Sequence, residues 1–273
     1  MTKYTVIGSS GFIGKNVCDF LRRKNESVLE VNRILPSNES PLGTVIYCAG
    51  FGNCLEPENV LDANFTYLSE IVDKCNFERI FYISSTRLYL NCLDGFENAS
   101  LLIFNEDKRS LFNLTKLMAE KFYNENPKFV SLRLSNVYGN AFKSTLFLPS
   151  IIRDAILHSK VKMFTGSEYA KDYINIKDVC NAIYLLSKEK ELSYNLYNIA
   201  SSTKTSAGDI LHEMSKHILF DIEWNQCVSE ERYPEISIER LKKQIDFNPS
   251  SVLDDIKDMS DVFKKHFEHM ERL

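Results

Sequence analysis

A glycine-rich turn near the N-terminus, between a short apolar strand and a helix, is the feature that most limits how this chain can fold. Residues 3–7 form an apolar, β-prone run, which breaks at the sequence Gly-Ser-Ser-Gly-Phe-Ile-Gly over residues 8–14. Apolar residues then recur at helical spacing up to Arg23, and residues 27–31 have the pattern of a second strand. This order predicts the βαβ unit that binds the phosphates of a dinucleotide.

Each glycine of the turn has a predicted task. Gly8 lets the chain turn tightly off the strand, Gly11 lets backbone N–H groups approach a pyrophosphate, and Gly14 lets the helix pack against the strand. The helix N-terminus adds its partial positive charge and unpaired donors. The spacing is G-x-x-G-x-x-G rather than the G-x-G-x-x-G of classical dehydrogenases, and a plain glycine turn would give the same letters. The position after the first strand favours the nucleotide-binding interpretation.

The end of the second strand bears on which dinucleotide is bound. An acidic residue there would bond the ribose 2′-hydroxyl of NAD, whereas this chain has Asn32 followed by Arg33. A neutral residue followed by arginine suits the 2′-phosphate of NADP. The sequence therefore favours NADP. Two alternatives stay open: the cofactor is NAD, or Arg33 is a solvated loop residue that does not contact the cofactor.

The composition excludes several classes of partner. A net charge of −4 leaves no basic field for nucleic acid. No apolar run approaches the ~18 residues of a membrane span, and no signal peptide precedes the first strand, so we expect a cytoplasmic protein without membrane contact. Seven scattered cysteines without a C-x-x-C pair, and five histidines without metal spacing, predict free thiols and no metal site.

Strands alternate with helices over the first half of the chain. We expect strands at 44–48, 79–83 and 129–134 and helices at 59–75 and 110–124. Such alternation predicts an α/β fold, a Rossmann-like doubly wound parallel sheet whose ligands gather at the carboxyl ends of its strands. The segments at such ends are the glycine turn, Ala49–Gly50, Ser84 to Arg87 and Ser135–Asn136.

Beyond residue 140 the alternation weakens. Helices are expected at 146–157, 176–187 and 207–218, and strands at 171–174 and 194–199, with a charged, mostly helical C-terminus. We therefore expect residues 1–140 to form a NAD(P)-binding Rossmann domain. Residues 141–273 should be mostly a small substrate-binding cap, with excursions back to the sheet.

Several short motifs follow one another along nearly the whole chain. They are Gly8 to Gly14, Ala49–Gly50, Ile83 to Tyr89, Leu114 to Lys116 with Glu120, Arg133 to Gly139, Lys171 to Val179 and Tyr197 to Ala200. This order resembles the extended short-chain dehydrogenase/reductases, the NAD(P)-dependent sugar-nucleotide epimerases, dehydratases and reductases. In such enzymes a Ser or Thr, a Tyr and a Lys act around the nicotinamide ring. The Tyr hydroxyl exchanges a proton with the sugar, and the Lys lowers the pKa of the Tyr.

The resemblance implies roles for individual residues. Ser85 takes the Ser/Thr position and Lys116 the Lys position, although alone they would be a strand-end cap and a solvated cation. The implied cofactor-binding residues are Gly8, Ser10, Gly11, Phe12, Ile13, Gly14, Asn32, Arg33, Ala49, Gly50, Ser84, Lys116 and Leu134. The implied substrate-binding residues are Thr86, Arg87, Asn136 and Lys171.

Phe112 is the main departure from the family pattern. It lies four residues before Lys116, where the catalytic Tyr belongs, and a phenyl ring has no proton to give. Three interpretations stay open: a variant inactivated by replacement of Tyr, a natural enzyme that uses another acid such as water or Tyr89, and a non-catalytic binder. Tyr89 fits packing better than acid catalysis.

Other departures narrow the reaction. The 4,6-dehydratases carry an Asp-Glu pair, and the 3,5-epimerase/reductases a Cys, where this chain has Thr86 and Arg87. The resemblance then implies an NADP-dependent reductase of a nucleotide-linked 4-keto-6-deoxy sugar in surface polysaccharide biosynthesis. An NAD-dependent nucleotide-sugar 4-epimerase and a nucleotide-binding protein without turnover are the alternatives. The family often dimerises through helices that correspond to 59–75 and 110–125, so a homodimer is expected.

Overall fold

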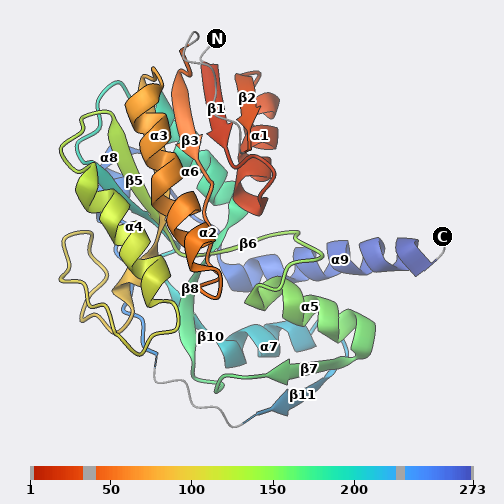
Figure 1. Cartoon of the computed structure of the whole chain (residues 1–273). Helices are drawn as coiled ribbons and strands as arrows, with labels where there is room; N and C mark the ends of the chain where they lie inside the picture. The colour runs from red at the N-terminus through yellow and green to blue at the C-terminus, as the bar shows by residue number, and fades with distance from the viewer. Residues whose placement is uncertain (1–2, 33–40, 226–230, 272–273) are drawn as a thin grey trace.

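A parallel sheet forms the core of the upper part of the molecule, as Figure 1 shows it, in the computed structural model, which describes residues 3–32, 41–225 and 231–271. Its six strands are parallel throughout and run in the order β2-β1-β3-β4-β5-β9. They are β1 (Lys3–Ile7), β2 (Ser27–Val31), β3 (Thr44–Tyr47), β4 (Arg79–Ser85), β5 (Phe129–Leu134) and β9 (Leu196–Ile199). The predicted α/β Rossmann-like fold is confirmed.

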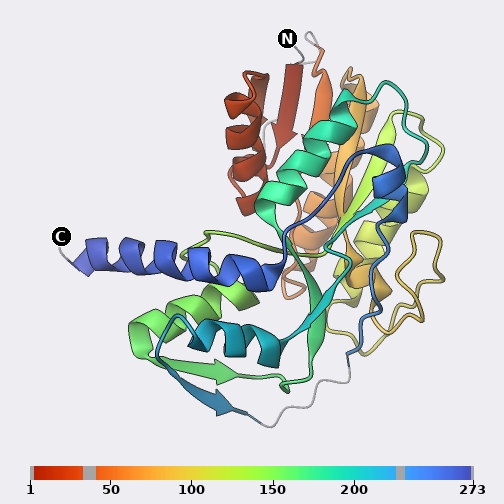
Figure 2. The same ribbon diagram turned by 180° about the vertical axis from the view of Figure 1, so that it is seen from behind.

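Helices cover both faces of this sheet. On one face lie α1 (Phe12–Arg23) and α6 (Ile176–Lys188), which Figure 2 shows side by side. On the other lie α2 (Pro57–Leu61), α3 (Tyr67–Lys74) and α4 (Ser110–Phe122). Successive strand residues point to opposite faces. Val6, Ile46 and Phe81 therefore join the core under α1 and α6, while their neighbours Ile7, Val45 and Tyr82 join the core under α3.

A π-helical turn over Asp62–Thr66 joins α2 to α3, where the sequence predicts one continuous helix. Such a turn interrupts the regular hydrogen bonds of the helix backbone. Here the hydroxyls of Tyr47 and Tyr82 donate to the backbone carbonyls of Ala63 and Asn64, at 2.8 and 2.9 Å. The turn is thus held against the sheet by two buried tyrosines.

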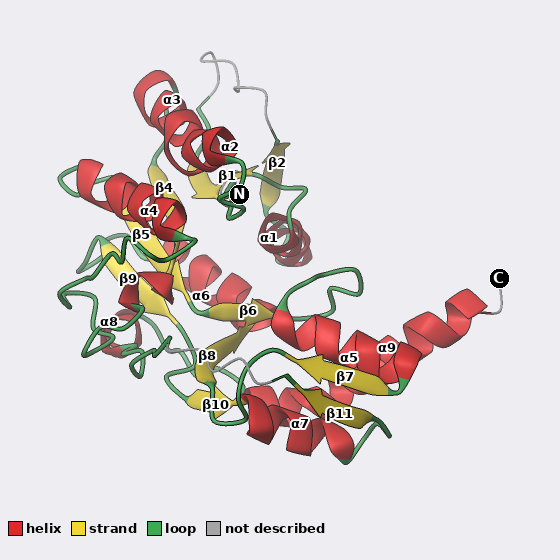
Figure 3. Cartoon of the chain, turned by 60° about the horizontal axis from the view of Figure 1, so that its bottom comes forward, coloured by secondary structure: helices red, strands yellow, loops and turns green. Residues whose placement is uncertain are grey.

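Two smaller sheets lie beyond the carboxyl ends of the main strands (Figure 3). One joins β10 (Lys204–Ser206), β8 (Ala170–Asn175) and β6 (Asn136–Tyr138); the other joins β11 (Asp221–Trp224) to β7 (Lys160–Met163). The remaining helices are α5 (Phe147–His158), α7 (Ala207–Ser215), α8 (Glu239–Gln244) and α9 (Val252–Glu271). Residues 136–138, expected to be a loop, form a strand because they pair with β8.

The second half of the chain contributes to both parts of the molecule. β9 is the edge strand of the main sheet and α6 packs on α1, whereas α5, α7 and α9 share a separate core around Ile152, Ile210 and Phe263. Within the described ranges, no helix is both long and apolar enough to cross a membrane.

Candidate active site

The glycine turn has the geometry of a nucleotide cradle. Gly8 has a φ of 78°, a conformation that side chains disfavour, and a Cβ there would lie 2.6 Å from the backbone nitrogen of Ala49. A Cβ on Gly14 would lie 2.2 Å from the carbonyl oxygen of Gly8, so only glycine lets α1 pack this closely. α1 begins at Phe12 without a side-chain cap, which leaves its N-terminal donors facing the turn. The residues present therefore fit the pyrophosphate of a dinucleotide.

Asn32 braces this turn from the end of β2. Its Oδ1 accepts hydrogen bonds from the Ser9 hydroxyl and from the backbone N–H of Ser10, both at 3.1 Å. The sequence singled out Asn32 for contact with the cofactor, and the structure adds a part in positioning the turn itself. Arg33, on which the preference for NADP depends, lies outside the described residues.

A buried asparagine, which lies on the apolar face of the predicted helix 59–75, shapes the next strand end. Asn64, in the π-helical turn, accepts a bond from the N–H of Phe51 and donates to the carbonyl of the same residue, at 3.2 and 3.0 Å. It also donates to the hydroxyl of Thr115 on α4 at 3.1 Å. Asn64 thus joins the segment after Ala49–Gly50 to the helix that carries Lys116. A polar residue on the apolar face of a predicted helix is the sequence signal that could have identified Asn64.

Lys116 reaches the same strand ends from α4. It is 4% exposed, its Nζ donates to the carbonyl oxygen of Ile83 at 2.8 Å, and it lies 4.6 Å from the centre of the Tyr82 ring. A Cβ on Gly50 would lie 3.2 Å from this Nζ. Burial lowers the pKa of Lys116 to about 7, although Glu120 and Cys48 act to raise it. Such a lysine is held by the fold rather than solvated.

Phe112 lies one helical turn before Lys116, with its ring 5.8 Å from the lysine Nζ. The guanidinium of Arg109 lies over this ring, 4.6 Å from its centre. Ser85 is at the carboxyl end of β4, where its hydroxyl accepts a bond from the N–H of Arg87 at 3.1 Å. As an acceptor, the hydroxyl keeps its own proton for a substrate. Ser85, Phe112 and Lys116 thus come from the elements that the sequence predicted.

Three other predicted positions are buried behind the strand ends. The Ser84 hydroxyl donates to Glu120 at 2.5 Å, Leu134 is part of the apolar core, and Thr86 is 5% exposed. Contacts of these three with a cofactor or substrate remain predictions.

The interpretation of Tyr89 as a substitute acid does not agree with the structure. It is fully buried, its hydroxyl donates to Asn198 at 2.8 Å and accepts a bond from Arg133 at 2.7 Å, and burial raises its pKa to about 12. It packs, as the sequence favoured. Arg133 in turn pairs with Glu120 at 2.6 Å, within a buried network that joins α4 to β5.

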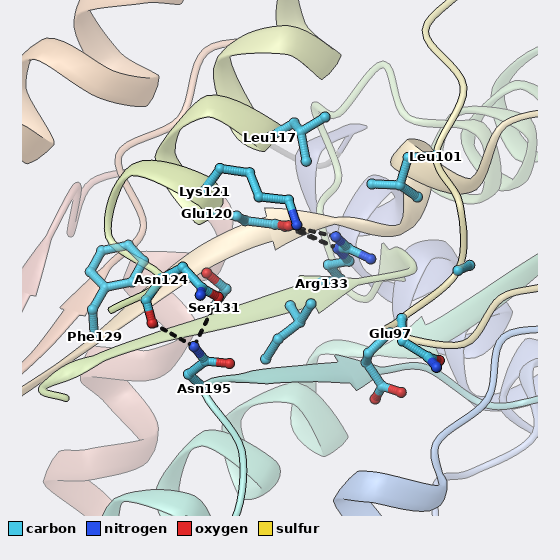
Figure 4. A pocket seen from close by; sticks show the side chains of 13 residues that line it. Glu97, Leu101, Leu117, Glu120, Lys121, Asn124, Phe129, Ser131, Arg133 and Asn195 are labelled. Atoms are coloured by element: carbon cyan, nitrogen blue, oxygen red, sulfur yellow. Dashed lines mark hydrogen bonds and ion pairs between the residues drawn. The ribbon is translucent and has the colours of Figure 1, made fainter. Parts of the chain in front are cut away.

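This network borders a polar pocket of about 300 Å³ between α4 and β9, shown in Figure 4. Glu120 and Arg133 are bonded to each other there, and Asn195 donates to Asn124. Its lining includes neither Ser85, Phe112 nor Lys116. We therefore assign the pocket to the packing of α4 against the sheet, not to catalysis.

Cations gather on the cap side of Ser85. Arg87 donates to Asp107 at 2.7 Å and to the Tyr233 hydroxyl at 2.9 Å, and also contacts Glu231. Lys171 lies between two aromatic rings, 4.8 Å from the centre of Tyr169 and 5.0 Å from that of Tyr233. The sequence predicts Arg87 and Lys171 as site residues. It does not single out Asp107, Arg109, Glu231 and Tyr233, because these residues lie in segments that have no regular structure and no local pattern.

Asn136 and Lys171 line one pocket of about 520 Å³ beside β6 and β8. Asn136 donates to the backbone carbonyl of Asp172 at 2.8 Å, which fixes the start of β6. The rest of the lining is largely apolar and comes from Leu146 to Pro149, Phe164 and Tyr173. An apolar pocket beside a cationic cluster suits a ligand with a flat base and an anionic group.

The chain is similar to several known proteins. The model of the NAD dependent epimerase/dehydratase family matches residues 4–200. A CDP-abequose synthase of Salmonella typhimurium is 26% identical over 239 aligned positions, and the alignment covers 77% of this chain and 79% of that protein. A UDP-glucose 4-epimerase of Mycoplasma genitalium is 20% identical over 333 aligned positions, covering 98% of this chain and 97% of that one.

Two solved structures share the fold. MoeE5 in complex with UDP-glucose and NAD aligns with a TM-score of 0.81 and 18% identity, covering 97% of this chain and 99% of the other. RMD from Pseudomonas aeruginosa complexed with NADPH aligns with a TM-score of 0.77 and 17% identity, covering 97% and 100%. Proteins of this fold thus bind either dinucleotide.

Proposed function

Because this chain belongs to the NAD-dependent epimerase/dehydratase family, we propose that it is an NADP-dependent reductase of a nucleotide-linked 4-keto-6-deoxy sugar, acting in surface polysaccharide biosynthesis. The observation that carries this proposal is at the end of β4. The Nζ of Lys116 donates to the carbonyl of Ile83, two residues before Ser85, whereas Thr86 and Arg87 occupy the positions where elimination of water would need an acid and a base. Arg87 is instead paired with Asp107. Simple transfer of a hydride, without elimination, is the chemistry that this set allows.

The residues have distinct tasks in the proposed reaction. The glycine turn and the N-terminus of α1 hold the dinucleotide phosphates, and the bound nicotinamide supplies the hydride. Lys116 would hold the nicotinamide ribose, and the Ser85 hydroxyl would donate a hydrogen bond to the carbonyl oxygen of the sugar. The hydride would reduce the carbonyl carbon, and water would supply the proton that the oxygen takes up, because Phe112 has no proton to give. Arg87, Asn136 and Lys171 bind the nucleotide part of the substrate. Residues 1–140 provide the dinucleotide site and most of 141–273 the cap.

A 4-epimerase is the second candidate, favoured by the likeness to a UDP-glucose 4-epimerase over nearly the full chain. An epimerase oxidises and re-reduces one carbon and so keeps its dinucleotide, whereas a reductase exchanges it at every turnover. We expect the purified protein to bind added NADPH reversibly and more tightly than NADH. Denaturing the purified protein and measuring the released dinucleotide by absorbance and chromatography shows how much of it, and which one, the protein retains. One equivalent of retained NAD per chain would instead establish the epimerase.

We also propose that the protein is a homodimer, joined through α4 and the adjacent helical segment formed by α2, the π-helical turn and α3. Leu61, Leu114, Met118 and Phe122 are apolar and 37 to 67% exposed, and Phe65 contacts Phe122 edge to face at 5.4 Å. Apolar side chains clustered on two adjacent helices are typical of a subunit interface.

Replacing Met118 with aspartate should therefore convert a dimer to a monomer, because the charge would be buried at the contact. Analytical ultracentrifugation measures the change, with Leu219→Asp, an exposed apolar residue in the cap, as the control. A mass unchanged by Met118→Asp, or a wild-type monomer, would refute this interface.

A further inference from the structure

The carboxylate of Glu231 lies among the cations of the cap, at the junction of two pockets. It borders both the pocket of about 520 Å³ that Asn136 lines and a second pocket of about 610 Å³ lined by Arg87, Phe104 and Arg109. We propose that Glu231 is an internal counter-ion that occupies the place of the substrate's diphosphate and must be displaced when the substrate binds. This inference rests on the proposed function, since it takes the ligand to be a nucleoside diphosphate sugar.

The contacts of Glu231 are those expected of a stand-in for a diphosphate. One carboxylate oxygen lies 3.3 Å from a guanidinium nitrogen of Arg87. The other accepts a hydrogen bond from the Tyr169 hydroxyl at 2.7 Å and lies 4.0 Å from the Nζ of Lys171. A single carboxylate therefore spans two cations from different elements. A diphosphate, with more oxygens and more charge, would satisfy both more fully.

Both cations have partners other than Glu231. Arg87 is held by Asp107 at 2.7 Å and by Tyr233 at 2.9 Å, and its Nε is buried without a hydrogen-bond partner. Lys171 rests between the rings of Tyr169 and Tyr233. A site whose cations are preorganised in this way needs no rebuilding when its counter-ion leaves.

Glu231 is also the carboxylate better placed to leave. Its side chain is 34% exposed and contacts Arg87 at 3.3 Å, whereas that of Asp107 is 8% exposed and contacts the same guanidinium at 2.7 Å. Burial acts to raise the pKa of Glu231, but the Tyr169 hydroxyl, Arg87 and Lys171 outweigh it and lower the pKa, so the group is charged at neutral pH. It therefore competes with an anionic ligand for the same partners.

The test is to replace Glu231 with glutamine, which keeps the shape and removes the charge. Calorimetric titrations with UDP, CDP, dTDP, GDP and inorganic pyrophosphate, at low and high salt, give the affinities. We expect Glu231→Gln to tighten binding of the preferred diphosphate by on the order of tenfold, because no carboxylate has to be displaced. Thermal unfolding of each variant checks that it is folded.

Glu106→Gln is the matched control, because Glu106 lines the second pocket and loses the same charge there. Tightening by Glu231→Gln and not by Glu106→Gln supports the counter-ion. Equal tightening by both variants would assign the effect to net charge and overturn the proposal. If the wild type binds a diphosphate and Glu231→Gln binds it equally or more weakly, the proposed role of Glu231 is overturned, while the proposed function stands. Failure of every diphosphate to bind any form overturns it together with the proposed function.

Discussion

Replacing Phe112 with tyrosine will raise the rate of NADPH-dependent reduction of a nucleotide-linked 4-keto-6-deoxyhexose by on the order of 100-fold or more, the usual contribution of a general acid. We expect the ring to occupy the place of such an acid, because it lies one helical turn before Lys116 on α4, with its centre 5.8 Å from the lysine Nζ. The substitution adds only the oxygen that can give a proton to the reduced sugar.

The surroundings of the ring should activate the new hydroxyl. The Arg109 guanidinium lies over the ring, 4.6 Å from its centre. Positive charge nearby stabilises a phenolate, so we expect a tyrosine here to have a pKa below its ordinary value. A spectrophotometric titration of the variant, against the wild type, measures that pKa independently of turnover.

The assay follows NADPH oxidation with a panel of nucleotide-linked 4-keto-6-deoxyhexoses. Phe96→Tyr, which adds a hydroxyl to an exposed ring outside the candidate site and the proposed interface, is the control and should leave the rate unchanged. Adding Lys116→Met to Phe112→Tyr should remove the gain. If the wild type turns over and Phe112→Tyr is no faster, another group supplies the proton. If neither form turns over but both bind nucleotide, a binding protein, or an epimerase whose substrate was absent, replaces the reductase.

The second large effect concerns stability. Replacing Glu120 with alanine should lower the free energy of unfolding by about 3–5 kcal/mol, because it leaves the charge of Arg133 buried with only neutral partners. Glu120 and Arg133 are 7% and 2% exposed, and the guanidinium makes three hydrogen bonds of 2.6 to 3.2 Å to the two carboxylate oxygens. Denaturant unfolding measures the loss.

Glu70→Ala is the control for this substitution. Glu70 pairs with Lys74 at 3.7 Å on the surface of α3, where the two side chains are 40% and 56% exposed, so its loss should change the free energy of unfolding by at most ~0.5 kcal/mol. Replacing Glu120 and Arg133 together by methionine should restore much of the stability, since no buried charge then remains. A loss below ~1 kcal/mol for Glu120→Ala would show that water or other groups replace the carboxylate.

Much of the main sheet was predictable because its signals are local. A glycine turn, apolar runs of strand length and helical spacing each lie within a few residues, and the structure places β1, α1, β4, α4 and β5 where they were expected. Ser85 and Lys116 could be predicted for the same reason, since each is positioned by its own strand or helix. The π-helical turn at Asp62–Thr66 was missed because the strands beneath it, through Tyr47 and Tyr82, stabilise it.

The sequence by itself determined the α/β class, the nucleotide cradle and the absence of a hydroxyl at Phe112, because these depend on residue type and near-neighbour spacing. Only the tertiary structure decided which charges face one another. Glu231 meets Arg87 across 144 residues, and Glu120 meets Arg133 across a helix and a strand. The first pair depends on how the cap folds back over the strand ends and the second on how α4 packs against β5, and no local pattern encodes either contact. The same long-range packing buries Tyr89 and lowers the pKa of Lys116, and so sets which groups remain for chemistry.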